Sequence, residues 1–159
     1  MTDLNIGDNA PDFTSATDGN KEITLSSLKG QKVVLYFYPK DDTPGCTKES
    51  CGFNEALQAF NALNTQIIGV SKDTIAKHDK FKAKYNLNFP LISDENGEVC
   101  DAYGVWKEKS MYGRTFMGIE RSTFLINEDG KIVKIWRKVK VKDHVDDVRA
   151  TIIEATKAA

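Results

Sequence analysis

The longest continuous apolar run in the chain, residues 33–38, places the strongest constraint on its fold. The run reads Val-Val-Leu-Tyr-Phe-Tyr, and unbroken apolar residues over this length are typical of a strand buried on both faces. Such a strand lies inside a sheet that other elements cover on two sides. Pro39 follows at once and cannot donate to a strand ladder, so the strand is expected to end there. The run is far too short to cross a bilayer, which takes about 20 apolar residues.

Strand and helix patterns alternate along the rest of the chain. Further strands are predicted at residues 12–16, 22–25, 66–70, 121–126 and 132–136. The last two are predicted to form a hairpin around the turn Asn127-Glu128-Asp129-Gly130. Apolar residues at helical spacing predict helices over roughly 45–63, 74–85, 95–103 and 144–157, with Asp143 as the N-cap of the last. This order predicts a single α/β domain over residues 1–159, a thioredoxin-like sandwich with helices on both faces of a central mixed sheet.

Composition and charge exclude several classes of function. The 159 residues are 40% hydrophobic and 28% charged, which is enough for one proper core. The net charge is -1 with both signs interspersed, so neither nucleic acid nor a membrane surface is an expected partner. The N-terminus lacks a signal pattern, and we expect a soluble cytoplasmic protein. Residues 131–142 hold six Lys or Arg, and the alternation in 138–142 indicates a solvated strand face or a protected edge.

The three cysteines, Cys46, Cys51 and Cys100, are too few for a disulfide framework in a chain of this length. A four-ligand zinc site would need both histidines and two cysteines, and no short paired spacing supports one. We therefore expect no metal and no cofactor. His78 and His144 are expected at the surface, and Cys100 is expected to be structural.

Cys46 is predicted to lie in the first turn of a helix that follows the buried strand. Thr43 is a good N-cap, and Pro44 occupies the first helical position, where its missing N–H does no harm. The unpaired N–H groups and the positive end of the helix dipole stabilise a thiolate at this position. The conjunction of Pro39, Thr43, Pro44 and Cys46, with a second cysteine five residues on, favours a reactive thiol over a small buried residue.

Cys46 and Cys51 are predicted to point in different directions from the same helix. Position 46 shares the core-facing side with Phe53, whereas position 51 faces water. Ideal helix geometry puts their Cα atoms about 8–9 Å apart, beyond the roughly 7 Å that a disulfide tolerates. A bond between them therefore requires the first turn to unwind, and Gly45 and Gly52 make that local unfolding less costly.

The pattern Pro39-x-x-x-Thr43-x-x-Cys46 resembles the active-site motif of the peroxiredoxins, and the second cysteine five residues later resembles their bacterioferritin-comigratory-protein (PrxQ) subfamily. The likeness continues over nearly the whole chain. It includes Gly7-Asp8-x-Ala10-Pro11-Asp12-Phe13, Leu25-Ser26-x-Leu28-Lys29-Gly30, Phe37-Tyr38-Pro39, Phe89-Pro90-Leu91-x-Ser93-Asp94, Tyr103-Gly104-Val105-Trp106 and Arg121-Ser122-Thr123-Phe124-Leu125-Ile126.

The resemblance implies a thiol peroxidase that reduces hydrogen peroxide and organic hydroperoxides. Cys46 corresponds to the peroxidatic cysteine, which becomes a sulfenic acid, and Cys51 to a resolving cysteine that forms a disulfide with it. Thr43 corresponds to the hydroxyl that holds the peroxide, and Arg121 to the guanidinium that favours the thiolate and orients the substrate. Thioredoxin, or a glutaredoxin-like reductant, would reduce the disulfide. Because both cysteines are in one chain, a monomer suffices.

Three further residues are assigned to the substrate side of the site. Pro39 corresponds to the residue that shields the pocket, and Gly45 immediately precedes the reactive cysteine. Glu49 either anchors Arg121 or is a solvated helix carboxylate.

Three other functions remain open at this point. A thioredoxin-type disulfide reductase normally has its cysteines two residues apart, which this chain does not. A redox sensor or holdase could use the same cysteine pair to change shape without turnover. A small zinc or nucleic-acid module is the third.

Overall fold

The computed structural model describes residues 4–158, which form a seven-stranded sheet, a separate two-stranded sheet and five α-helices. The strands are β1 (Thr14–Thr17), β2 (Lys21–Thr24), β3 (Lys32–Phe37), β4 (Thr65–Ser71), β5 (Leu91–Ser93), β6 (Trp106–Met111), β7 (Arg114–Ile119), β8 (Ser122–Ile126) and β9 (Ile132–Trp136). The α-helices are α1 (Pro44–Glu55), α2 (Leu57–Ala62), α3 (Ile75–Tyr85), α4 (Glu98–Ala102) and α5 (His144–Ala158), and two short 3₁₀ helices are η1 (Asp18–Asn20) and η2 (Leu25–Leu28).

The topology of the large sheet brings segments that are far apart in the sequence to the same end of its central strands. Its strand order is β2-β1-β5-β4-β3-β8-β9. β3, β4 and β5 run parallel, whereas β8 runs antiparallel to β3 with Phe37 opposite Ser122. Pro39, which follows β3, and Arg121, which precedes β8, therefore lie at the same end of these two strands. Open α/β sheets place their ligands at this carboxyl end of the parallel strands.

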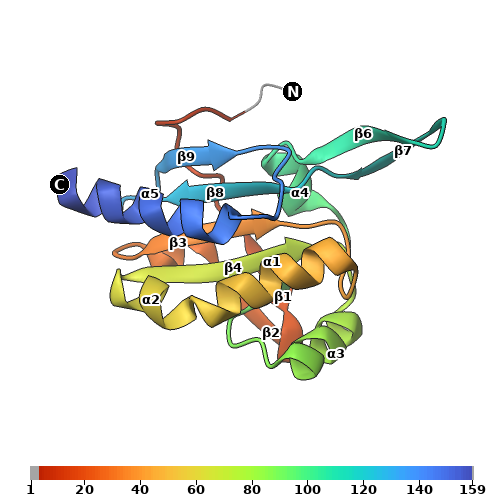
Figure 1. The fold of residues 1–159 in the computed structure, drawn as a ribbon, viewed down its shortest axis with the longest axis horizontal. Helices are drawn as coiled ribbons and strands as arrows, with labels where there is room; N and C mark the ends of the chain where they lie inside the picture. Colours follow the sequence, from red (N-terminus) through yellow and green to blue (C-terminus); the bar gives the residue numbers. More distant parts are fainter. Residues whose placement is uncertain (1–3, 159) are drawn as a thin grey trace.

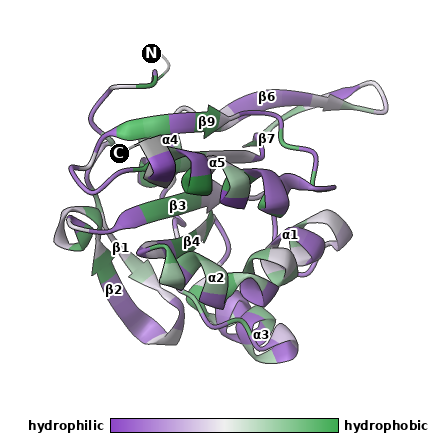
Figure 2. Cartoon of the chain, turned by 60° about the vertical axis from the view of Figure 1, so that its left-hand side comes forward, coloured by the Kyte–Doolittle hydropathy of each residue, from purple (hydrophilic) through white to green (hydrophobic). Residues whose placement is uncertain are grey.

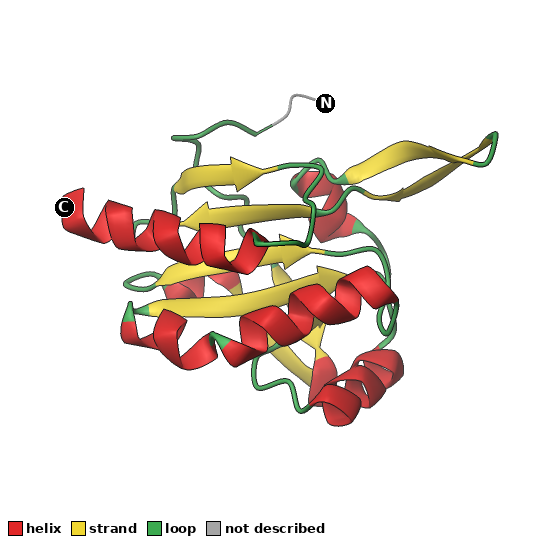
Figure 3. Ribbon diagram, in the orientation of Figure 1, coloured by secondary structure: helices red, strands yellow, loops and turns green. Residues whose placement is uncertain are grey.

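Helices cover both faces of the sheet, as predicted (Figures 1 and 3). Alternate residues of β3 enter two separate cores, which explains its unbroken apolar run. Val34, Tyr36 and Tyr38 pack in the core beneath α1, α2 and α5, and their neighbours along the strand pack in the core with α4 and η2. In Figure 2 the central strands β3 and β4 are largely hydrophobic, whereas β6 is largely hydrophilic. No helix within residues 4–158 is both long and apolar enough to cross a membrane.

The hairpin of β6 and β7 projects from the body of the molecule (Figure 1) and was not predicted from the sequence. Its strands carry polar residues on both faces, so they lack the apolar alternation that marks a half-buried strand. The two residues between the strands, Tyr112 and Gly113, both have positive φ, at 52° and 77°. Left-handed backbone at both positions of a two-residue loop is the geometry that matches strand twist in tight hairpins.

The short strand β5 (Leu91–Ser93) was also not predicted, and three details of the predicted elements were wrong. The helix expected over 45–63 breaks at Ala56 (φ -91°, ψ 3°), and this break lets α2 turn onto β4. Residues 138–142 form a loop rather than a strand, because the backbone is left-handed at Lys138 (φ 48°). Asp143 precedes α5 as predicted, but its φ of 61° is left-handed rather than the extended conformation of an N-cap.

Candidate active site

Cys46 lies in the first turn of α1, just beyond the carboxyl end of β3. Thr43 has the extended backbone of an N-cap (φ -95°, ψ 155°) and Pro44 opens the helix, as the sequence predicted. The Thr43 carbonyl accepts the first helical hydrogen bond from the Thr47 N–H at 2.8 Å. The Thr43 hydroxyl does not cap the helix, because it donates to the Lys40 carbonyl at 2.9 Å. The Cys46 thiol is buried, with 1% of the residue exposed.

Arg121 joins Cys46 to Glu49. Its Nη2 donates to the Cys46 Sγ at 3.3 Å, and its Nη1 donates to the Glu49 Oε1 at 2.7 Å. The side chain of Arg121 is 17% exposed and that of Glu49 is fully buried. The expected contact between Glu49 and Arg121 is therefore present, and the alternative of a solvated carboxylate is excluded. The guanidinium is held by one nitrogen and presents the other to the sulfur.

Burial and Arg121 act in opposite directions on the pKa of Glu49. Its Oε2 has no hydrogen-bond partner among the described residues. Desolvation raises the pKa of Glu49 to about 7, although the charge and hydrogen bond of Arg121 act in the opposite direction. Burial thus makes the charged carboxylate less favourable than it is in water. Arg121 keeps its second nitrogen, Nη2, on the sulfur of Cys46.

The absence of a side chain at Gly45 permits this arrangement. A Cβ at this position would lie 3.2 Å from the Arg121 Nη2 and 3.9 Å from a methyl group of Val141. Val141 belongs to the loop that was predicted as a strand. The same loop is tied to the site by a hydrogen bond from the Val139 N–H to the Arg121 carbonyl at 3.0 Å. Arg121 and the loop with Val139 and Val141, which are far from α1 in the sequence, thus pack against its start.

Cys51 lies one turn further along α1 and is partly exposed, as the helix pattern predicted. All three cysteines are free. Burial, and secondarily the charge of Glu55, raises the pKa of the Cys51 thiol. Because α1 is continuous from Pro44 to Glu55, both cysteines belong to one intact helix.

Contacts of Ser50, Gly52 and Phe53 fix the second half of α1 to the core and to α5. The Phe53 ring stacks on Tyr36 with the ring centroids 4.7 Å apart. The Ser50 hydroxyl is 2.7 Å from the Tyr36 hydroxyl inside the core. A Cβ at Gly52 would lie 3.1 Å from a methyl group of Val145, so α1 approaches α5 closely at this point. These contacts tie α1 to the core from about Ser50 onward.

Cys100 and one of the cavities of the molecule lie away from this site. Cys100 is fully buried in α4, and burial, together with the nearby Asp94, raises the pKa of its thiol. A cavity of about 300 Å³ is lined by residues that include Leu25, Ile126 and Gly130. Ile126 ends β8, whereas Arg121 precedes its start, so this cavity lies at the opposite end of the strand from Cys46.

Both histidines are buried, so the prediction that they lie at the surface was wrong. The His144 Nε2 lies 2.8 Å from the Thr123 hydroxyl, and burial lowers the pKa of His144 to about 4. His78 is 0% exposed and contacts Asp41. A polar residue on the inner face of an amphipathic helix is the signal that could have identified His78, because position 78 lies three residues before the buried Phe81 on α3.

Lys109 is a further cation near the site that sequence reasoning missed, because it lies on the unpredicted hairpin. Its Nζ donates to the Ile119 carbonyl at 2.7 Å. Burial, followed by the positive charge of Arg121, lowers the pKa of Lys109, while the Cys46 sulfur opposes that change.

Comparisons with known proteins agree with this geometry. The profile described as the AhpC/TSA family matches residues 6–135. Peroxiredoxin Bcp of Bacillus subtilis is 50% identical over 149 residues, which cover 94% of this chain and 95% of that protein. A PrxQ mutant from Xylella fastidiosa superposes with a TM-score of 0.93 at 41% identity, covering 98% of this chain and 99% of that one.

A third similar structure belongs to the Xanthomonas campestris bacterioferritin comigratory protein. That structure belongs to a set of trapped intermediate and ligand complexes, which concern the alkyl peroxide reduction activity of that protein. Its TM-score is 0.86 at 45% identity, with 90% of this chain and 91% of that chain covered.

Proposed function

The chain belongs to the AhpC/TSA family and, within it, to the Bcp/PrxQ peroxiredoxins with their thioredoxin-like fold, so it is a thiol peroxidase; we propose that Cys46 is the cysteine that the peroxide oxidises. Peroxiredoxins act on peroxides and are generally recycled by thioredoxin-type reductants. The proposal assigns each step of that cycle to residues of this chain.

In the first step the Cys46 thiolate attacks the terminal oxygen of a hydroperoxide. The S–O bond forms as the O–O bond breaks, the leaving oxygen takes up a proton, and the products are the Cys46 sulfenic acid and water or an alcohol. Negative charge moves from the sulfur onto the leaving oxygen during this displacement. Donors that are already oriented toward both atoms lower its barrier.

Arg121 is the group best placed to stabilise that charge. It stays protonated at all physiological pH values and presents a rigid fork of donors, of which Nη2 already contacts the Cys46 sulfur. Glu49 holds the other terminal nitrogen of the guanidinium, Nη1. Thr43 would orient the peroxide with its hydroxyl, after giving up its bond to the Lys40 carbonyl. Pro39 would shield the pocket.

In the second step Cys51 resolves the sulfenic acid. The Cys51 sulfur attacks the Cys46 sulfur, a disulfide forms and water leaves. Both residues lie on one intact helix, so the first turn of α1 has to unwind before the two sulfurs meet. The firm packing that begins near Ser50 confines this unwinding to the start of the helix. The exposed disulfide then becomes accessible to a thiolate of the reductant.

Further parts of the proposal concern the partners and the setting of the enzyme. Hydrogen peroxide and organic hydroperoxides are the substrates, and thioredoxin or a glutaredoxin-like protein is the reductant. The chain is a single domain over residues 1–159, acts as a monomer in the cytoplasm, and binds neither nucleic acid nor a membrane. One continuous large sheet and a family match over residues 6–135 support the single domain.

The observation that carries the proposal is the 3.3 Å contact between Arg121 and the buried sulfur of Cys46 in the first turn of α1. Its test compares peroxide consumption by Cys46→Ser and Cys100→Ser, with thioredoxin and its reductase as the reducing system. Cys46→Ser should abolish consumption, while Cys100→Ser should retain it. Peptide mapping after one equivalent of peroxide should find the Cys46–Cys51 bond. Activity in Cys46→Ser, or a bond from Cys46 to Cys100, contradicts the assignment, and stoichiometric oxidation without turnover favours a redox sensor.

A further inference from the structure

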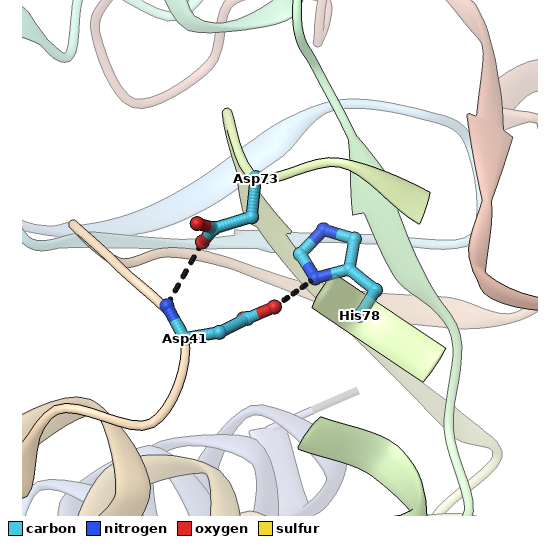
Figure 4. Close-up of side chains that lie close together, drawn as sticks. All are labelled: Asp41, Asp73 and His78. Carbon is cyan, nitrogen blue, oxygen red and sulfur yellow. Dashed lines mark hydrogen bonds and ion pairs between the residues drawn. The ribbon is translucent and has the colours of Figure 1, made fainter. Parts of the chain in front are cut away.

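A buried polar cluster lies beside the segment that connects β3 to α1. Asp41 belongs to this segment, Asp73 follows β4, and His78 comes from the first half of α3. Figure 4 shows the Asp41 carboxylate directed at the His78 ring, with the backbone nitrogen of Asp41 directed at Asp73. The peroxidase mechanism described above uses none of these three side chains.

His78 is enclosed by acceptors on both sides of its ring. Its Nδ1 lies 2.6 Å from the Asp41 Oδ2, and its Nε2 lies 2.8 Å from the Ile92 carbonyl. A carbonyl cannot donate, and neither can an ionised carboxylate, so with Asp41 ionised both ring nitrogens carry protons and the ring is an imidazolium. Burial opposes this charge, but the bonds and charges of Asp41, the Ile92 carbonyl and Asp73 raise the pKa of His78 overall. His78 and Asp41 therefore form a buried ion pair.

Asp41 is held by other contacts as well. Its Oδ1 accepts a hydrogen bond from the Tyr38 hydroxyl at 2.6 Å. Its backbone N–H donates to the Asp73 Oδ2 at 2.8 Å, and that oxygen also accepts from the Ser71 hydroxyl at 2.6 Å. The segment before α1 is thus fastened to the ends of β3, β4 and β5 and to α3. By contrast, the neighbouring Asp42–Lys84 pair is exposed on both sides and adds little, as surface pairs do.

A metal ion does not account for the cluster. The oxygen and nitrogen atoms of Asp41, Asp73 and His78 lie within 4.8 Å of one another, which is compatible with metal ligands. However, Asp41 and His78 are already joined at hydrogen-bond distance, and an ion would have to break that pair. The polar atoms of the cluster satisfy one another instead.

Asp41 stands two residues before Thr43 and five before Cys46, so it marks the start of the part of the chain that must open. Resting on the proposed function, we propose that His78 is a positioning residue that anchors the segment from Pro39 to Thr43 through Asp41. The anchor keeps Cys46 in its pocket for the reaction with peroxide. It also stops the unwinding of α1 from spreading back into β3 when the disulfide forms.

A weaker anchor should change the two chemical steps in opposite directions. Opening of the first turn becomes easier, so fewer molecules hold Cys46 beside Arg121 and oxidation slows. The same opening brings Cys46 to Cys51 more often, so disulfide formation becomes faster. A variant that is merely destabilised has no reason to accelerate one step while it slows the other.

The test replaces His78 by Phe, which fills the site but leaves the Asp41 carboxylate buried without its partner. In reduced His78→Phe, exchange of the Asp41 amide, whose N–H donates to Asp73, should rise at least about tenfold, because an unpaired buried charge is strongly destabilising. Oxidation by hydrogen peroxide should slow and formation of the Cys46–Cys51 disulfide should accelerate, both measured by rapid-quench alkylation and mass spectrometry. Lys82→Met is the control, since it removes the 2.7 Å ion pair between α3 and Asp18 without touching the segment, and it should leave all three readouts unchanged.

Asp41→Asn is the second variant, and it decides the matter if His78→Phe does not fold. The amide can accept from Tyr38 and donate to a neutral His78, so the bonds persist without the ion pair. Faster amide exchange, slower oxidation and faster disulfide formation should all appear again, each to a smaller extent. Unchanged exchange of the Asp41 amide, or rates of oxidation and disulfide formation that both fall, would overturn the proposed anchor. Amide exchange in the reduced protein involves neither oxidation nor disulfide formation. The exchange result therefore stands even if Cys51 proves not to be the resolving cysteine.

Discussion

Gly45→Ala should make α1 more stable and the enzyme slower. Alanine is favoured over glycine in a helix by up to about 1 kcal/mol. The new Cβ, however, would lie 3.2 Å from the Arg121 Nη2, which is closer than such contacts ordinarily are. Arg121 is the more mobile partner, because Gly45 is part of the helix backbone. We therefore expect the guanidinium to move away from the sulfur of Cys46.

The size of the effect follows from the observed distance. At an effective dielectric constant of about 20, unit charges at the observed 3.3 Å attract by about 5 kcal/mol, and at about 3.8 Å by about 4.4 kcal/mol. A displacement of about 0.5 Å therefore removes about 0.7 kcal/mol, which corresponds to oxidation slowed by up to about threefold. The added helix stability slows unwinding, and with it disulfide formation, by up to about fivefold.

Rapid-quench alkylation with mass spectrometry separates the thiol, sulfenic acid and disulfide forms of Gly45→Ala over time after peroxide addition. Gly52→Ala is the matched control, because its Cβ meets Val145 at 3.1 Å and lies far from Arg121. Because the new contact is with α5 rather than with Arg121, it should leave oxidation unchanged. If Gly45→Ala oxidises as fast as Gly52→Ala, the contact between Arg121 and Cys46 does not set reactivity, and the reasoning above is refuted.

Two further predictions concern charged groups. Arg121→Ala should slow oxidation by about 10²–10³, the usual scale for one oriented donor, and thiolate absorbance should appear at higher pH than in the wild type; an unchanged rate and titration would reduce Arg121 to an ion-pair partner of Glu49. His144 should make the protein less stable as the pH falls from about 6.5 to about 4, because burial lowers its folded pKa to about 4 and the unfolded chain takes up the proton first. Urea unfolding across that range should show the slope, and His144→Gln should reduce it; an equal slope in both proteins would assign it to other groups.

Six of the seven strands of the large sheet were predictable because their signal is local, whereas β5, with three residues, was missed. Burial on both sides gave β3 its apolar run, and the turn at residues 127–130 marked the hairpin of β8 and β9. β6 and β7 could not be found in this way, because a hairpin that projects into water needs no apolar face. Its left-handed turn at Tyr112 and Gly113 carries only one glycine as a sequence signal.

The site was predictable where it depends on helix geometry or on a recognised motif. Cys46, Thr43 and Pro44 occupy the expected positions at the start of α1. The motif pointed to Arg121, and the structure places its guanidinium against the sulfur. The buried cluster around His78 was missed because its parts are polar and come from three separate segments, and no local pattern shows that Asp41 will neutralise a histidine 37 residues later.

The start of α1 has to satisfy two opposing requirements, and the contacts that hold the chain on either side of it show how both can be met. In the proposed mechanism, reaction with peroxide needs Cys46 fixed beside Arg121, whereas the disulfide needs Cys46 to leave this position. Asp41 is fastened by a buried ion pair on one side, and Phe53 is stacked in the core on the other. Between them lie Gly45 and Gly52, which lower helix stability. The proposed opening is therefore confined to a short segment, and the core on either side stays intact while the thiol of Cys46 moves.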